Sequence, residues 1–182
     1  MPLYEICHSY PLTRSQKDTL ASFITILHSQ TFTTPTQFVN IQFTTPEPVG
    51  DYYVGGKSQQ LVSPNRLIAT VRVGPSRTKS MFDDVGIKIR QKWDEVVERP
   101  YGELDMKNPA VEERERKNLR FIVFKPMTAA IENGVVVPGA GEEGTWLKDN
   151  MDFFREQVKM YDDDEFKELL EEVQARDDLC VQ

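Results

Sequence analysis

Apolar residues recur along the first 125 residues in two alternating patterns. Short runs rich in β-branched and aromatic residues, typical of strands, cover residues 2–8, 38–45, 66–73 and 119–125. Apolar positions with helical spacing lie between them. In the first helical segment these are Leu20, Phe23, Ile24 and Leu27, and in residues 77–98 they are Met81, Val85, Ile89 and Val96. The order is therefore strand–helix–strand, twice over.

This order predicts the fold class. A helix between two strands is long enough for a right-handed crossover to a parallel neighbour. Two such β-α-β units give an α+β domain: a four-stranded mixed sheet with both helices on one face. Thr13 and Gln16 form a capping-box pattern that predicts the start of the first helix.

The remaining segments are predicted as follows. Residues 47–57, with their glycines and aromatics, indicate a hairpin, and the long segment 99–118 is expected to hold a helical turn. After residue 125 we expect a short helix, an Asn-Gly turn and a glycine-rich loop. From Met151 we expect two charged helices, which divide the chain into a domain of residues 1–150 and an acidic helical extension of 151–182. The extension is expected to dock through Phe153, Phe154, Val158, Leu169, Leu170 and Val173.

Charge and composition narrow the function classes. The net charge of −7 equals that of residues 151–182 alone, which hold eleven acids and four bases, so the remainder is balanced. No basic surface is expected, and hence no nucleic-acid partner. No apolar run reaches membrane-spanning length, and the start lacks a signal-peptide pattern. Cys7 and Cys180 lie too far apart in sequence to indicate a disulfide framework or a zinc site. We expect a soluble, cytoplasmic protein.

Motifs for nucleotide, zinc and serine-hydrolase chemistry are absent from the sequence. Pro2 offers a different chemistry. If Met1 is removed, Pro2 has a free secondary amine, and burial would lower the pKa of that amine, which is ordinarily near neutrality. Such a group exchanges protons at physiological pH. If Met1 is retained, Pro2 is a tertiary amide without a basic nitrogen, and its role is a rigid start to the strand.

Four further residues are candidates, each with a plainer alternative. His28 lies at the far end of the first helix, where it is either catalytic or a half-buried partner of the helix dipole. Arg72 and Arg77 flank the turn before the second helix, and could bind a carboxylate or be ordinary surface residues. Glu132 precedes the Asn-Gly turn, as a partly buried base or as a solvated side chain.

Taken together, Pro2, His28, the two arginines and the stretch "IENGVVVPGAGEEGTW" of residues 131–146 resemble the tautomerase superfamily. The resemblance is to its cis-3-chloroacrylic acid dehalogenase group and covers roughly residues 2–150. It implies an enzyme with neither metal nor organic cofactor, assembled as a homotrimer. It also implies hydration or dehalogenation of 3-substituted acrylates, or keto–enol tautomerisation of small oxo-carboxylic acids.

The resemblance assigns a role to each residue. Pro2 is the catalytic amine, and His28 positions the substrate or the attacking water. Arg72 and Arg77 bind the substrate carboxylate, and Glu132 activates water.

The sequence departs from the family pattern in two places. Phe124 stands where the family has an assisting tyrosine, so it lines the pocket without a hydroxyl group. Arg72 and Arg77 are further apart than the family's pair, because "GPS" (residues 74–76) resembles an insertion. Two alternatives stay open. One is a decarboxylase of the malonate semialdehyde type, and the other is a non-catalytic binding protein, favoured by Phe124 and by retention of Met1.

Overall fold

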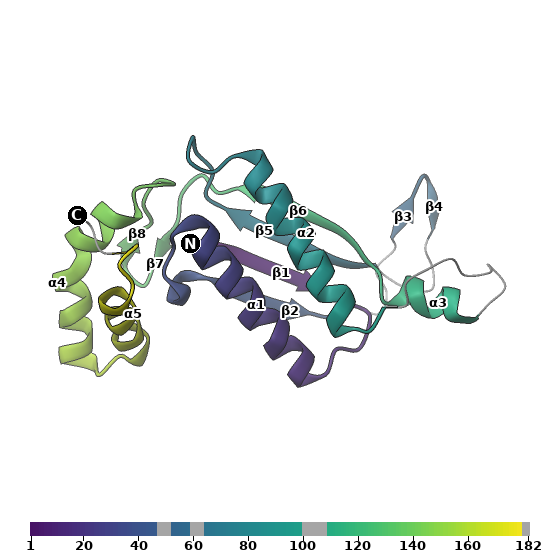
Figure 1. Ribbon diagram of the computed structural model, residues 1–182, viewed down its shortest axis with the longest axis horizontal. Coiled ribbons are helices and arrows are strands. Elements are labelled where there is room, and N and C mark those ends of the chain that lie inside the picture. The colour runs from purple at the N-terminus through teal and green to yellow at the C-terminus, as the bar shows by residue number, and fades with distance from the viewer. Residues whose placement is uncertain (47–51, 59–63, 100–108, 180–182) are drawn as a thin grey trace.

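A four-stranded mixed sheet forms the centre of the molecule (Figure 1). The computed structural model describes residues 1–46, 52–58, 64–99 and 109–179. The strand order is β2-β1-β5-β6, with β1 parallel to β2, antiparallel to β5, and β5 parallel to β6. These strands are β1 (Leu3–Cys7), β2 (Asn40–Thr44), β5 (Asn65–Val71) and β6 (Leu119–Pro126). The predicted α+β fold class is confirmed.

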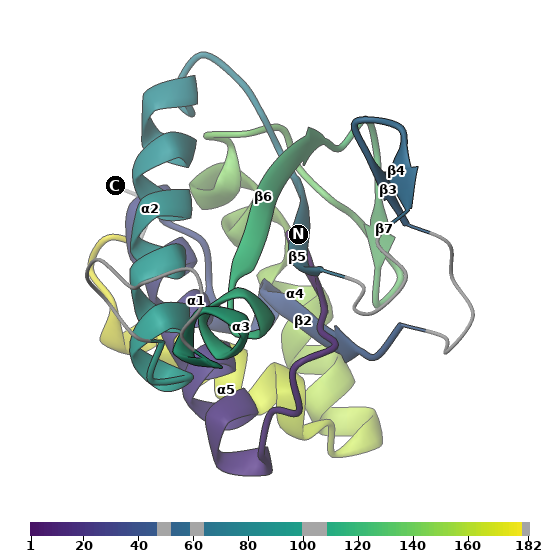
Figure 2. The same cartoon turned by 90° about the vertical axis from the view of Figure 1, so that its right-hand side faces the viewer.

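Two helices, α1 (Arg14–Phe32) and α2 (Lys79–Val96), lie side by side on one face of the sheet (Figure 2). The predicted capping box begins α1, since the Thr13 hydroxyl accepts from the Gln16 amide and the Gln16 side chain accepts from the Thr13 amide. The Gln16 side chain also donates to the Val96 carbonyl at 2.9 Å, which ties the start of α1 to the end of α2. The core lies between these helices and the sheet. Its largest buried side chains include Trp93, Tyr4, Ile6, Leu20, Ile24, Leu67, Ile89 and Leu119.

Smaller elements lie at the end of the sheet away from the N-terminus (Figure 1). Strands β3 (Tyr53–Val54) and β4 (Lys57–Ser58) form the hairpin predicted for residues 47–57, of which 47–51 lie outside the described residues. Helix α3 (Pro109–Arg116) confirms a helical element in the segment 99–118, of which 100–108 are likewise outside.

The prediction of a short helix after residue 125 is wrong. Residues 127–130 have no regular structure, and β7 (Ile131–Glu132) pairs with β8 (Val135–Val136) in an antiparallel hairpin. Asn133 and Gly134 adopt φ values of 48° and 85° between them. Positive φ at both central positions is the conformation of the tight hairpin turn that Asn-Gly favours. The turn therefore imposes a strand on Glu132 where a helix was expected.

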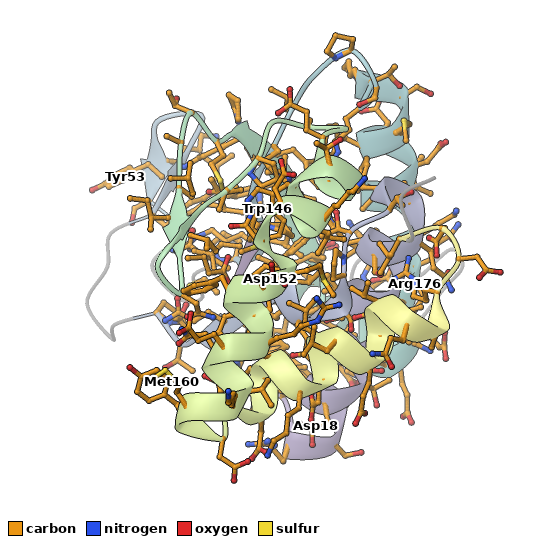
Figure 3. The ribbon with its side chains drawn as sticks, turned by 90° about the vertical axis from the view of Figure 1, so that its left-hand side faces the viewer. Asp18, Tyr53, Trp146, Asp152, Met160 and Arg176 are labelled. Atoms are coloured by element: carbon orange, nitrogen blue, oxygen red, sulfur yellow. The ribbon has the colours of Figure 1, made fainter. Side chains whose placement is uncertain are left out.

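Helices α4 (Glu143–Tyr161) and α5 (Asp164–Ala175) lie across the end of the sheet where the N-terminus is found (Figures 1 and 3). The prediction that the helices begin at Met151 is wrong, because α4 begins at Glu143 and crosses residue 150 without a break. Their predicted docking residues are confirmed. Phe154, Leu169 and Val173 are buried in a second cluster, and Phe153, Val158 and Leu170 pack against it.

The second cluster joins the C-terminal helices to the N-terminal part of the chain. It contains Met1 and Phe38, the latter in the 3₁₀ turn η1 (Thr36–Phe38). The Trp146 ring (labelled in Figure 3) lies 5.3 Å from that of Phe38, and its indole N–H donates to the Val136 carbonyl at 2.7 Å. A single core thus spans η1, the β7–β8 hairpin and both helices. No helix in the described parts of the chain is long and apolar enough to cross a membrane.

Candidate functional site

The sheet topology brings four segments of the chain to one edge. Because β1 is antiparallel to β5, with Leu3 opposite Thr70, the start of β1 lies beside the end of β5. Because β6 is parallel to β5, with Pro126 opposite Val71, the chain that follows β6 emerges there too. The start of β2 lies beside that of β1, and the Asn40 amide donates to the Pro2 carbonyl at 3.0 Å. Pro2, Arg72 and Glu132 therefore meet from three distant parts of the sequence.

The N-terminus at this edge is buried. Pro2 is buried, and Met1 is only 4% exposed. Burial and the charges of Arg72 and Arg77 lower the pKa of the Met1 amine to about 5, although the charge of Glu132 opposes this. The amine is consequently neutral at pH 7, which is the form that accepts a proton or attacks a carbonyl.

Arg72 and Arg77 are both buried, not surface residues. Arg72 follows β5 directly, and Arg77 closes a turn in which its amide donates to the Gly74 carbonyl at 3.0 Å. Their side chains bind the same carboxylate oxygen, Oε1 of Glu143, from Arg72 Nη2 at 2.8 Å and from Arg77 Nη2. Desolvation lowers the pKa of each guanidinium to about 10, so both stay charged at pH 7.

Glu143 is the site residue that the sequence analysis missed. It is the first residue of α4 and is 6% exposed. Its second oxygen, Oε2, accepts from the Gly141 amide at 2.8 Å. The only sequence signal was its place inside "GEEG", where it reads as one of two loop glutamates.

His28 is fully buried, which excludes the half-buried alternative. Its Nδ1 is 2.9 Å from the Tyr4 hydroxyl, to which it is hydrogen-bonded. Burial, followed by the charges of Arg77 and Arg72, lowers the His28 pKa to about 3, so the ring is neutral. The Phe32 ring lies between the two groups, 4.7 Å from the His28 ring and 5.1 Å from the Arg77 guanidinium.

Glu132 is held beside the N-terminus through Asn40. The Asn40 side chain donates to Glu132 Oε1 at 2.9 Å, while its backbone amide holds the Pro2 carbonyl. Glu132 is half-buried, and its charge acts on both Arg72 and the N-terminal amine. The β7–β8 hairpin therefore presents a carboxylate to the amine.

Phe124 lies under α2. Its ring is 5.2 Å from that of Phe82, which is in turn 4.8 Å from Phe32. It is the far end of a row of rings that leads to His28, so its assignment as a pocket-lining residue stays a prediction. Across the described residues, no group of three or more His, Cys, Asp or Glu side chains is placed to hold a metal ion.

A sequence comparison with known families identifies the family of this chain. The family described as "Putative oxalocrotonate tautomerase enzyme" matches residues 1–151, well over half of the chain. The chain belongs to this tautomerase family. A comparison with curated protein sequences finds no match.

Several solved structures share the fold at low sequence identity. N1, a member of the cis-3-chloroacrylic acid dehalogenase family, superposes with a TM-score of 0.60 at 18% identity, over 86% of this chain and 98% of its own. A point mutant of RhCC from Rhodococcus jostii RHA1 matches with a TM-score of 0.50 at 20% identity, over 81% and 89% of the two chains. A fused 4-OT described as an asymmetric trimer matches with a TM-score of 0.50 at 15% identity, over 74% and 94%. The predicted place in the tautomerase superfamily is confirmed by the family match, and the fold is shared with a member of the cis-3-chloroacrylic acid dehalogenase family.

Proposed function

We propose that this tautomerase-family protein is an enzyme that uses its N-terminal amine on small unsaturated or oxo-carboxylic acids. One observation supports this most: the N-terminus is buried beside two buried arginines and a carboxylate, in surroundings that lower the pKa of the amine of Met1. In the catalytic form, Met1 is removed and Pro2 supplies the amine at the same edge of the sheet. The Met1 side chain is part of the second buried cluster, so its loss would leave the remaining apolar side chains of that cluster as a wall for the substrate.

Keto–enol tautomerisation is the reaction that the electrostatics favour. A neutral amine can remove a proton from the carbon next to the oxo group, and the electron pair then moves onto the oxo oxygen as an enolate. The charges of Arg72 and Arg77 would bind the carboxylate and stabilise the enolate. The amine then returns its proton to the enolate oxygen, or to the far carbon of the conjugated system where the substrate is unsaturated. The substrate is therefore isomerised without any co-reactant.

Hydration or dehalogenation of a 3-substituted acrylate is the second candidate, favoured by the position of Glu132 near the amine. Glu132 would remove a proton from water as its oxygen attacks carbon 3, and the amine would protonate carbon 2. With chloride on carbon 3, the adduct loses HCl to give malonate semialdehyde. This route needs a protonated amine, and the burial and arginine charges that lower the pKa of the Met1 amine would disfavour the protonated form of the Pro2 amine too.

The alternatives from the sequence remain distinguishable. A non-catalytic protein is favoured by the packing of Met1, whose side chain is part of the second cluster. Intact-mass measurement decides whether Met1 remains. A decarboxylase would release carbon dioxide from a 3-oxoacid, whereas the tautomerase would release none.

We also propose a homotrimer in the cytoplasm. Among the described residues, no helix covers the sheet face opposite α1 and α2 (Figure 2), and Glu5, Ile68 and Val123 lie in one row across that face. Bare faces and edges of this kind are usually covered by association. Light scattering is expected to give about 63 kDa, three times the 21.0 kDa of one chain.

Steady-state assays test the proposal directly. Phenylenolpyruvate ketonisation and 3-chloroacrylate turnover are measured for the wild-type protein and for Pro2→Ala, Arg77→Ala and Glu132→Gln. Arg77→Ala is expected to abolish both activities, Pro2→Ala to abolish ketonisation, and Glu132→Gln to affect hydration most. Glu95→Gln, an exposed change on α2, is the control. Unchanged turnover in all three site variants would rule the assignment out.

A further inference from the structure

The Glu143 carboxylate already occupies the two arginines in the manner of a bound ligand. Both guanidiniums bind its Oε1, and its Oε2 is held by the Gly141 amide. A buried carboxylate that receives donors on both oxygens is strongly fixed. A substrate carboxylate must therefore bind to hydrogen-bond donors of the site that Glu143 does not use.

The loop before α4 keeps Glu143 in this position. Arg72 Nη1 donates to the Pro138 carbonyl at 3.2 Å. Gly141 has φ +91°, and a Cβ there would lie 2.7 Å from the Ser76 hydroxyl oxygen. Gly74 approaches the same loop, since a Cβ on it would lie 3.1 Å from that of Ala140. Such close packing leaves little room for Glu143 to withdraw.

Some donors at the site remain unused. Within the described part of the chain, Arg72 Nε, Arg77 Nη1 and His28 Nε2 are buried and have no hydrogen-bond partner. Buried polar atoms are normally paired, so an unpaired set in a site marks a place for a ligand. Both arginines bind the same oxygen of Glu143, and the Phe32 ring contacts both His28 and the Arg77 guanidinium, which places these atoms in one site.

The charges of the site set how many anionic groups it accepts. Arg72 and Arg77 contribute +2, Glu143 and Glu132 contribute −2, and the amine is neutral at pH 7 because its pKa is about 5. Without Glu143 the sum would be +1. A second anionic group on the ligand would meet the fixed Glu143 or Glu132 with no further cation to balance it.

We infer that Glu143 is a specificity-determining residue that restricts the arginine site to substrates with a single carboxylate group. This deepens the proposed function and rests on it for the substrate's reaction, but not for its binding. Dicarboxylates are expected to bind poorly because their second carboxylate would add a negative charge to a site that already contains Glu143 and Glu132. A like charge about 6 Å away in a partly buried site reduces affinity about tenfold to a hundredfold.

Crotonate and fumarate test this inference, because both are four-carbon acids with a trans double bond. Crotonate has a methyl group where fumarate has its second carboxylate. Dissociation constants are measured by calorimetry at pH 7 for the whole wild-type chain, with its intact mass recorded. Crotonate is expected to bind at least about tenfold more tightly than fumarate. Glu143→Gln is expected to reduce that preference by about tenfold, since fumarate can then place its second carboxylate against the freed guanidinium donors. Glu156→Gln, an exposed change further along α4, leaves the preference unchanged.

Several outcomes would overturn the inference. These are equal or tighter wild-type binding of fumarate, no wild-type binding of crotonate, and an unaltered preference in folded Glu143→Gln. If Glu143→Gln does not fold, Glu143→Asp keeps the charge and must keep the preference, and the wild-type ratio still decides. Because binding is measured without turnover, an inactive protein that prefers crotonate would refute the proposed reaction and leave this inference standing.

Discussion

The N-terminal amine permits a test in which two substitutions must act in opposite directions. Burial and the nearby arginines lower the pKa of the Met1 amine from its usual 8.0 to about 5. At pH 6.5 an ordinary amine is about 3% neutral and this one about 97% neutral, a difference of about thirtyfold. Arg72→Met removes a positive charge and is expected to raise the pKa, whereas Glu132→Gln removes a negative charge and lowers it. Each change is expected to be about one pH unit.

Competitive labelling measures this pKa. A trace of an acylating reagent is applied between pH 4 and 9, and the labelled N-terminal peptide is quantified by mass spectrometry. Intact mass shows whether the amine belongs to Met1 or to Pro2, and the shift is expected in the same direction for either. Lys79→Met, an exposed substitution at the start of α2, is the control and leaves the midpoint unchanged. A wild-type midpoint near 8, or two variants that move together, would refute the electrostatic reasoning.

Three further predictions concern stability. First, the pKa of His28 is about 3 in the folded protein against 6.5 in the unfolded chain, so the free energy of unfolding falls as the pH drops below 6.5. Between pH 7.5 and 4.5, urea unfolding is expected to show a loss of stability about 2–3 kcal/mol larger in the wild-type protein than in His28→Gln, and equal losses would contradict this. Second, Leu147→Ala, at a position 1% exposed, costs about 2–5 kcal/mol, whereas Met160→Ala, at 62% exposed, changes stability by less than about 0.5. Third, Arg176 donates to Ser29 Oγ and Glu172 at 2.6 Å each, so Arg176→Ala increases hydrogen exchange throughout α5; protection equal to wild type would show that the docking does not depend on it.

The strand order was predictable because it follows from local patterns. The spacing of Thr13 and Gln16 predicts the start of a helix, and the alternation of apolar and polar residues in 66–73 predicts a strand. Pro2 and Arg72 then meet by topology, because an antiparallel β1–β5 pair places the start of one strand beside the end of the other. Their proximity was implied by the fold that the sequence resembles.

Other features could not be predicted, because they depend on distant partners. Nothing near Glu143 indicates that two arginines about seventy residues earlier would bury it. The run "PGAGEEG" has the composition of a loop, yet α4 begins inside it. The first turn of a helix tolerates poor helix formers, because its amides have no helical partner in any case. Asn-Gly was recognised as a turn, but the hairpin that it forms requires pairing between Ile131 and Val136.

The C-terminal helices are part of the site as well as a cover for it. Helix α4 supplies Glu143, and the cluster beneath α4 and α5 buries the Met1 side chain. Burial is also the largest cause of the lowered pKa of the amine. The same docking therefore controls two properties, the charge of the arginine pocket and the protonation of the amine. A variant that loosens these helices from within the extension, such as Leu169→Ala at a position 1% exposed, should raise the pKa of the amine toward 8 and weaken the preference for one carboxylate. An acidic extension that were only a tail would leave both unchanged.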